Sequence, residues 1–249
     1  MKQKIKRMTF WALIGFLLLI IVNQLFWIKR SEDTSEYYET LRKEMAQQTT
    51  DEVILNETTL ENVVPLYSYK PNDQLTLINE NSDYVGWVFI ENTRINYPVV
   101  RAQDNAYYLN NDFTKRPSKP GAIFMDYRNI GQFNDRHTVI YGHYMEDGSM
   151  FGDLHLYKSE SFFKQNRQIV YKGLYEEKTY TIFSVTIETA DDYEIDLRIV
   201  DEDYITNLKE ASLHDLDIEL DLNKKILTLV TCSYEIDNGR IIIHAFENE

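Results

Sequence analysis

The chain has 249 residues, of which 43% are hydrophobic and 13% aromatic, so it can hold one sizeable domain and an additional segment. Its formal net charge of −14 at pH 7 argues against non-specific nucleic-acid binding, which needs a basic face. High solubility is the simplest interpretation of that charge. Cys232 is the only cysteine, so the chain cannot form an internal disulfide and its fold depends on its core.

The N-terminal part of the chain is apolar. No charged residue lies between Arg7 and Lys29, and this run has the roughly 20 residues needed to cross a bilayer core of about 30 Å. Trp11 and Trp27 lie near its ends, where indole rings favour the membrane interface. The basic residues before the run predict a cytoplasmic N-terminus and an extracellular domain. A cleaved signal peptide is the alternative, but no A-x-A cleavage site follows Ile28.

Helices are expected at several places after this run. Residues 31–52 are polar and acidic, and their apolar side chains recur at helical spacing, which predicts a helix packing lightly on the domain. A connection that contains Pro65 and Pro71 follows over residues 51–73. Further helical pieces are predicted at residues 74–81, 105–110, 159–164 and 202–211.

The remaining segments predict a mainly β domain. Short apolar or alternating runs indicate strands at residues 85–90, 95–100, 122–125, 138–141, 168–171, 179–187, 226–230 and 241–246. Pro98 indicates an edge strand or a bulge in the second of them. Many short strands with few helices favour a closed or sandwiched β-fold.

Cys232 follows an apolar strand and precedes a polar turn at residues 235–239. A cysteine attacks a carbonyl as its thiolate, which needs a nearby cation. A hairpin turning about Ile236 would set Arg240 opposite Cys232, with the two Cβ atoms roughly 5 Å apart. A turn centred later would shift this register. A buried, inert Cys232 and a surface Arg240 are the alternative interpretations.

Among the five histidines, His143 has the most suitable position for a catalytic base. It follows a strand and Gly142, where a glycine lets the backbone turn or approach closely. The others begin the same strand, lie in expected helices or alternate within a strand (His137, His155, His214 and His244). The sequence has no H-x-x-x-H or C-x-x-C spacing, so a zinc site is not expected.

Several segments together resemble the class B sortases, which are cysteine transpeptidases of Gram-positive bacteria. Residues 228–232, TLVTC, resemble the TLxTC signature of sortases, and Arg240 falls where their essential arginine follows. Residues 141–143, YGH, resemble the sortase histidine motif. Class B features recur at residues 95–100, 104–113, 121–126 and 150–154. The resemblance extends from about residue 74 to the end, and the shared order of the segments makes it specific.

The resemblance implies an eight-stranded sortase-type β-barrel with added helices, an N-terminal helical segment and a single transmembrane anchor. The chain would then divide into a cytoplasmic tail and anchor at 1–30, a helix and linker at 31–73, and a catalytic domain at 74–249. The implied reaction is cleavage of a C-terminal sorting motif of the NPxT-[NG] type after its threonine. The acyl group would pass through a thioacyl enzyme to the amine of a cell-wall precursor.

The resemblance also implies roles for individual residues. Cys232 would be the nucleophile, His143 the acid and base, and Arg240 the cation that stabilises the transition state. Substrate contacts would fall on Asn105, Leu109, Tyr193 and Thr231. No metal or other cofactor is implied. The implied partners are surface proteins with a sorting motif, a peptidoglycan precursor or cross-bridge amine, and the membrane, but no nucleic acid.

Two other classes of protein compete with this interpretation. A papain-like hydrolase or an L,D-transpeptidase also joins a cysteine and a histidine, but neither predicts TLVTC followed by Arg240. A membrane-tethered binding or scaffold protein predicts a thiol that does not react with substrate-like electrophiles. Product analysis with and without an amine acceptor separates a hydrolase from a transpeptidase.

The charge pattern around the apolar run makes a prediction about topology. Protease added to intact, wall-stripped cells should digest the domain and spare the N-terminus, because the excess of positive charge holds the N-terminus in the cytoplasm. Fragments would be detected with tags at both ends of the chain. Protection of the domain from protease would contradict the predicted orientation.

Overall fold

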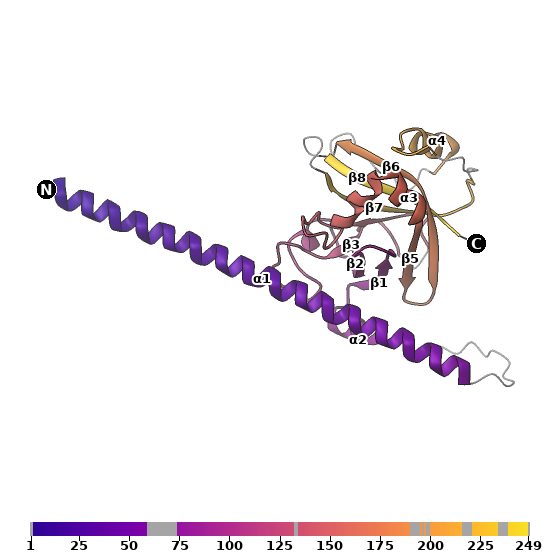
Figure 1. The fold of residues 1–249 in the computed structure, drawn as a ribbon, viewed down its shortest axis with the longest axis horizontal. Helices are drawn as coiled ribbons and strands as arrows, with labels where there is room; N and C mark the ends of the chain where they lie inside the picture. The colour runs from indigo at the N-terminus through magenta and orange to yellow at the C-terminus, as the bar shows by residue number, and fades with distance from the viewer. Residues whose placement is uncertain are drawn as a thin grey trace.

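A computed structural model describes residues 2–58, 74–131, 134–189, 195, 197, 200–215, 221–233 and 239–248, with the backbone alone at 2–9, 47–58 and 232–233. These residues form one long helix, α1, and a β-barrel with short helices around it (Figure 1). Residues 51–58 of the expected connection are the end of α1. The rest of that connection, with Pro65 and Pro71, lies outside the described residues.

The described strands form a closed eight-stranded barrel in the order β1-β2-β3-β4-β7-β8-β6-β5. The pairs β2–β3 and β4–β7 are parallel, and the other pairs are antiparallel. The strands are β1 (Tyr84–Phe89), β2 (Asn96–Val100), β3 (Ile123–Met125), β4 (His137–Tyr141), β5 (Gln168–Gly173), β6 (Glu177–Thr189), β7 (Ile226–Ser233) and β8 (Gly239–Glu247). The predicted eight-stranded β-barrel is therefore confirmed, and each strand falls on a predicted run.

Alternation along the strands separates the barrel interior from its outer face. On β7 and β8, Leu229 and Ile243 belong to the main core. Val230 and Ile242, one residue along each strand, pack in a separate cluster with Val139 of β4. The outer face of β4, β7 and β8 is thus buried under further chain, and the catalytic candidates lie on the continuation of this face.

The prediction that Pro98 marks an edge strand or a bulge is wrong in both forms. The sheet is closed, so β2 has a neighbour on each side. Pro98 pairs with Trp87 of β1, and the ladder with β3 begins one residue later, at Val99. The register shift lies instead in β1, between Tyr84 and Gly86. Proline has no backbone N–H to donate, and none is missing at Pro98 on the β3 side because the ladder with β3 begins only at Val99.

Short helices lie around the barrel, and four of the five fall on the predicted ranges, whereas η2 lies outside them. They are α2 (Gln74–Glu80), η1 (Tyr107–Leu109), η2 (Gly152–Lys158), α3 (Glu160–Gln165) and α4 (Glu202–Glu210), of which η1 and η2 are 3-10 helices. Ser159 and Asp201 cap α3 and α4, and the side chain of each accepts a hydrogen bond from the backbone N–H of the third residue of its helix. His214 is a correction, because it lies beyond α4 and its buried ring stacks on Phe163 at 4.6 Å.

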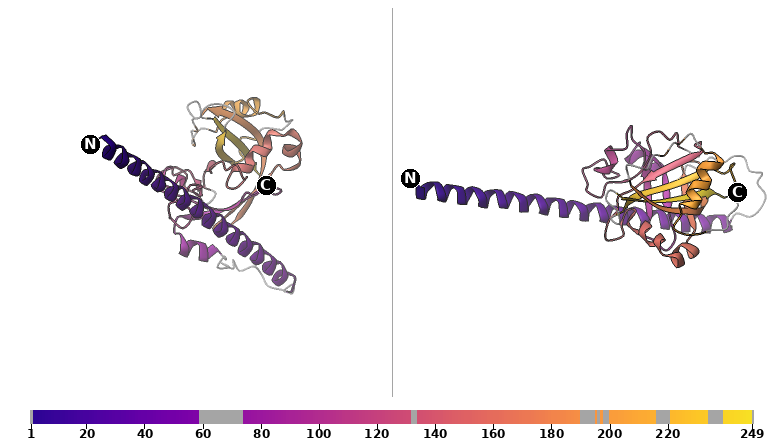
Figure 2. Two further views of the ribbon diagram at one scale, coloured as in Figure 1. Left: turned by 60° about the vertical axis from the view of Figure 1, so that its left-hand side comes forward. Right: turned by 90° about the horizontal axis from the view of Figure 1, so that it is seen from above.

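The apolar run and the acidic segment after it form one continuous helix, α1 (Lys2–Thr58). Figures 1 and 2 show its first half projecting away from the barrel and its second half lying along one side. The stretch Phe10–Ala46 is long and apolar enough to cross a membrane, and its most apolar part is not buried in the protein.

The second half of α1 is docked on the barrel more firmly than the sequence predicts. Tyr38 is 2% exposed and packs in the main core with Leu41. Its hydroxyl accepts from the backbone N–H of Phe113 at 3.2 Å and donates to the carbonyl of Gly121 at 3.3 Å. A buried phenol with both hydrogen bonds made is costly to withdraw, so this contact fixes the helix on the barrel.

Charged and polar side chains also bind α1 to the barrel at positions closer to the apolar run. The Arg30 guanidinium lies 3.3 Å from the buried carboxylate of Asp112. One turn later, the hydroxyls of Thr34 and Ser118 are hydrogen-bonded at 3.0 Å in a buried position. The helix therefore meets the barrel within two residues of Ile28, the last residue of the apolar run.

Two buried histidines share one threonine on the outer face of the barrel. The Thr228 hydroxyl lies 2.8 Å from His137 Nε2 and 2.8 Å from His244 Nδ1. Both rings are fully buried. Burial lowers the pKa of His137 to about 4 and that of His244 to about 3. The nearby charge of Arg128 lowers the pKa of His137 further, and His137 in turn lowers the pKa of His244.

These histidines predict acid-sensitive stability. Both are neutral when folded, whereas an exposed histidine has a pKa near 6.5. Between about pH 6.5 and 4 the unfolded chain binds more protons, so the free energy of unfolding falls as the pH falls. The free energy of unfolding should change with pH by up to about 1.4 kcal/mol per pH unit for each histidine. Urea denaturation from pH 7.5 to 5 measures it, and His137→Gln with His244→Gln should flatten it. An equally steep slope in the double variant would contradict this account.

Candidate active site

The ends of three strands meet at one rim of the barrel. The parallel ladder of β4 and β7 ends with the pair Tyr141 and Val230. The N–H of Gly142 then donates to the carbonyl of Val230 at 3.1 Å, which brings the next residue, His143, to the level of Cys232. Along the other side of β7, Cys232 pairs directly with Arg240 of β8. The rim therefore brings the three candidate residues into neighbouring positions.

The cross-strand pair of Cys232 and Arg240 confirms the register predicted from sequence. Directly opposed residues of an antiparallel pair occupy the same face, with Cβ atoms about 5 Å apart. A turn centred later in residues 235–239 would have broken this pairing. Residues 234–238 lie outside the described residues, but the strands that flank them fix the register.

Close packing positions His143 after β4. A Cβ added at Gly142 would lie 2.5 Å from Cδ1 of Ile123 and 2.7 Å from Cγ of Phe151, so only glycine fits here. The N–H of Phe151 donates to the carbonyl of His143 at 3.0 Å. His143 Nε2 lies 2.7 Å from the carbonyl oxygen of Leu109. Because a carbonyl only accepts, Nε2 carries a proton in this arrangement.

Arg240 has a cross-strand partner on each side: Cys232 on β7 and the acidic residue Glu188 on β6. Glu188 of β6 pairs with Arg240 across the β6–β8 ladder. Glu188 accepts a hydrogen bond from the hydroxyl of Thr186 at 2.9 Å. Sequence reasoning missed Glu188 because the predicted strand ended at Ile187, one residue short of it. The alternation of β6 was the signal available for finding it.

The four residues expected to contact substrate have different environments. Leu109 is 36% exposed and borders the histidine through its carbonyl. Thr231 is 2% exposed and occupies the face of β7 opposite to the Cys232 position. Its hydroxyl has no hydrogen-bond partner within the part of the chain that the structure describes. Tyr193 lies outside the described residues.

Asn105, the fourth of these residues, is part of a polar network. Its Oδ1 accepts from the backbone N–H of Tyr127 at 3.0 Å, and its Nδ2 donates to Asp126 at 3.0 Å. Arg128 donates to both carboxylate oxygens of Asp126, from Nε and Nη2 at 2.9 Å each. The hydroxyl of Tyr141 adds a bond at 3.0 Å. Asp126 thus joins the segment before η1 to the end of β4.

Neighbouring hydrogen-bond donors keep the carboxyl group of Asp126 ionised. The carboxylate is fully buried, and burial alone would raise its pKa. Hydrogen bonds from Arg128, Asn105 and Tyr141 outweigh the burial and hold the pKa of Asp126 below its usual value. The ionised carboxylate therefore supports Tyr141, which lies two residues before His143. Sequence reasoning did not single out Asp126, because only the fold brings its partners together.

Among the residues whose side chains are described, no three His, Cys, Asp or Glu form a group that could hold a metal ion. The residues that the rim does bring together are those that acyl transfer by a cysteine needs: a nucleophile, a proton carrier and a cation.

Comparison with known proteins agrees with this class of chemistry. The sortase domain model matches residues 88–248. Sortase B of Listeria monocytogenes is 37% identical over 169 residues, which cover 66% of this chain and 69% of that protein. The structure of Clostridium perfringens sortase B is 37% identical with a TM-score of 0.68, covering 71% of this chain and 100% of that one. A substrate complex of Staphylococcus aureus sortase B is 25% identical with a TM-score of 0.76, covering 89% and 99%.

The chain therefore belongs to the sortase family of cysteine transpeptidases. The similar proteins are class B sortases, and this class, expected from the order of the sequence motifs, is confirmed.

The polar network predicts a stability effect at Asp126. Asp126→Ala should lower the free energy of unfolding by about 2 kcal/mol, because it leaves half-buried donors of Asn105 and Tyr141 without their acceptor. Glu91→Ala, at an exposed turn, should stay within about 0.5 kcal/mol. Urea denaturation of the two variants at pH 7 measures the difference. Equal stability of the two variants would show that the network contributes little.

Proposed function

We propose that this chain is a membrane-anchored class B sortase that cleaves a C-terminal sorting motif of the NPxT-[NG] type after its threonine. It then transfers the acyl group to the amine of a cell-wall precursor. The observation that supports the proposal most is the pairing of Cys232 with Arg240 beside the end of β4, where His143 follows. Such a cleavage corresponds to a cysteine peptidase activity, and an amine in place of water makes the reaction a transfer.

In the first half-reaction, the thiolate of Cys232 attacks the threonine carbonyl carbon. The carbonyl electron pair moves to oxygen, and Arg240 stabilises the resulting oxyanion as an oriented cation. The C–N bond then breaks. His143, as imidazolium, gives its proton to the leaving amine, which departs and leaves a thioester on Cys232.

In the second half-reaction, the acceptor amine attacks the thioester carbon. His143, now neutral, takes the proton of the amine, and the C–S bond breaks to return the thiolate of Cys232. A new amide bond joins the surface protein to the acceptor. The Leu109 carbonyl supports the use of His143 Nδ1 in both proton transfers, because Nε2 already donates to that carbonyl.

The proposed substrate contacts are Asn105, Leu109, Tyr193 and Thr231. The exposure of Leu109 beside the histidine supports its side chain as a contact. Thr231 would act through its main chain, because its side chain is 2% exposed. Both polar groups of Asn105 already have partners, so it would hold the rim in shape or exchange a bond when the peptide arrives.

We further propose the segments 1–30 as cytoplasmic tail and anchor, 31–73 as helix and linker, and 74–249 as the extracellular catalytic domain. The apolar window in Phe10–Ala46 supports the anchor. The continuity of α1 across residue 30 means that anchor and domain would share one helix. The proposed partners are surface proteins with a sorting motif and an amine of the peptidoglycan precursor or cross-bridge.

The mechanism predicts graded losses of activity. Cys232→Ala and His143→Ala should abolish cleavage of an NPxT-type peptide, because the first removes the nucleophile and the second the proton carrier. Arg240→Lys keeps the charge but loses the planar fork of donors, and should slow turnover by about 10²–10³. Turnover is measured with the purified full chain and variants of matched thermal stability, with and without an amine acceptor.

Arg136→Lys is the matched control, since Arg136 precedes β4 at the end opposite to His143, and it should retain normal turnover. Near-normal turnover of Arg240→Lys would mean that only its charge matters or that it lies outside the reaction. Appreciable activity in Cys232→Ala would overturn the covalent mechanism. Hydrolysis without transfer to any amine would favour a peptidase.

A further inference from the structure

Two side chains on the face of α1 that packs on the barrel lead to His143, and we propose that Tyr38 and Arg42 position this histidine for the proposed reaction. They are four residues apart in one helix, so they lie on the same face of it. Tyr38 leads to the imidazole ring of His143, and Arg42 leads to its backbone. This inference rests on the proposed function, because it assigns positioning residues to the same site.

The first route runs from the hydroxyl of Tyr38 to the ring of His143. The hydroxyl donates to the carbonyl of Gly121 at 3.3 Å. Gly121 has a φ of +63°, and a Cβ added there would lie 2.5 Å from the carbonyl oxygen of Tyr108 and 2.8 Å from that of Leu109. The backbone of Gly121 therefore packs against the same oxygen that lies 2.7 Å from His143 Nε2. A shift of Gly121 would move this acceptor.

The second route runs from Arg42 to the backbone of His143. Arg42 Nη2 donates to the hydroxyl of Tyr97 at 2.9 Å, and the guanidinium carbon lies 4.6 Å from the centroid of that ring. The same hydroxyl accepts from the N–H of Met150 at 2.9 Å. Met150 has a φ of +54°, a conformation that a residue with a side chain keeps only when its surroundings hold it. The next N–H, that of Phe151, donates to the carbonyl of His143 at 3.0 Å.

The two routes touch each other where they leave α1. The rings of Tyr38 and Tyr97 lie edge to face, with centroids 5.3 Å apart and planes at 88°. Both side chains are buried in the main core. A displacement of the helix would therefore disturb both routes together.

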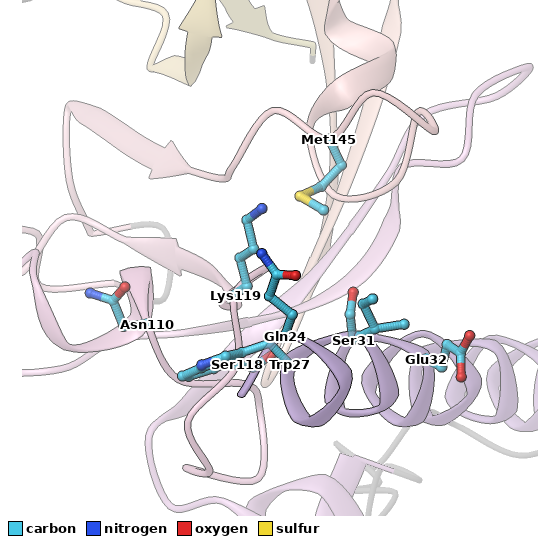
Figure 3. A pocket seen from close by; sticks show the side chains of 9 residues that line it. Gln24, Trp27, Ser31, Glu32, Asn110, Ser118, Lys119 and Met145 are labelled. Carbon is cyan, nitrogen blue, oxygen red and sulfur yellow. The ribbon is translucent and has the colours of Figure 1, made fainter. Parts of the chain in front are cut away.

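The loops that carry the ends of the two routes also lie against α1. Figure 3 shows Asn110 and Met145 bordering one cavity together with Ser31 of the helix. Asn110 follows Leu109 in the chain, and Met145 lies two residues after His143. The acceptor of the imidazole and the histidine itself are thus both close to segments that contact α1.

This support matters because His143 gives and takes its proton at one place. The Leu109 carbonyl only accepts, so Nε2 carries a proton and Nδ1 is the nitrogen that exchanges one. If the carbonyl or the histidine backbone moves, the neutral ring can also carry its proton on Nδ1, and this tautomer cannot take a proton from the amine at that atom. A misplacement of about 1 Å can cost about 10²-fold in rate.

Turnover of an NPxT-type peptide by the full chain in detergent micelles is measured first. Tyr38→Phe removes only the hydroxyl, and Arg42→Met removes the guanidinium but keeps an apolar stem. Each should lower kcat on the order of tenfold and leave KM within about twofold, because each weakens part of an acid–base contribution of about 10²–10⁴.

Two control variants lose comparable contacts elsewhere. Tyr171→Phe removes a buried phenol hydroxyl that donates to the carbonyl of Val85 at 3.1 Å. Arg167→Met removes a guanidinium that donates to the carbonyl of Ile182 at 3.1 Å and lies 5.8 Å from the ring centroid of Phe163. Both lie in or next to β5, which is opposite to β4 in the order of the barrel, so both should keep a normal kcat.

The tautomer of His143 gives a readout that does not depend on activity. The full chain is labelled with ¹⁵N-histidine in a Cys232→Ala background, so that no thiolate holds the imidazole in its charged form. Spectra are recorded at pH 8.5, roughly two units above the pKa of an ordinary histidine, and the signals are assigned by their loss in His143→Gln. Without a further change the ring should carry its proton on Nε2 alone. Tyr38→Phe and Arg42→Met should each give a mixture of both tautomers, and the two controls should not.

An unchanged tautomer in both variants would overturn the inference, as would an unchanged kcat. Equal losses of kcat in Tyr171→Phe and Arg167→Met would also overturn it, because they would show general destabilisation alone. If the wild type cleaves no sorting peptide while the tautomer changes as expected, the proposed function is refuted and the positioning of His143 by α1 stands.

Discussion

Strands β4 and β7 run parallel, and this direction determines where the candidate site forms. Because both strands end at the same rim, the residues that follow β4 lie beside the last residues of β7. Strand β8 returns antiparallel to β7 and begins at that rim, which pairs Cys232 with Arg240. An antiparallel β4 would carry His143 to the opposite rim. The parallel ladder therefore brings together three residues that are separated by up to 97 positions in the chain.

The rim is supported by contacts that leave little room for rearrangement. Gly142 is packed too closely for any side chain, and the Leu109 carbonyl orients the imidazole of His143. Asp126 ties the end of β4 to the segment before η1. On the side of the barrel that carries η1, α1 is fixed through buried Tyr38 and the Arg30–Asp112 pair. The proposed anchor and the barrel that carries the proposed catalytic rim are thus joined by direct contacts of α1.

Much of this arrangement follows from local sequence. All eight strands were predictable because each is an apolar or alternating run. The pairing of Cys232 with Arg240 was one of the registers that a hairpin over residues 235–239 allows, and the structure selects it. What the sequence did not predict depends on contacts between distant segments. The docking of Tyr38 requires Phe113 and Gly121, the role of Asp126 requires Asn105 and Arg128, and Glu188 becomes a neighbour of Arg240 only when β6 is extended.

The central claim is that Cys232 becomes acylated by a sorting peptide. Mass spectrometry of the full chain, quenched in acid soon after mixing with an NPxT-type peptide, tests it most directly. The account predicts one adduct with the mass of the peptide up to its threonine, located on the proteolytic fragment that contains Cys232. The adduct should disappear when an amine acceptor is added, with a new amide product formed in equal amount. Cleaved peptide without any adduct, or an adduct on another residue, would contradict the account.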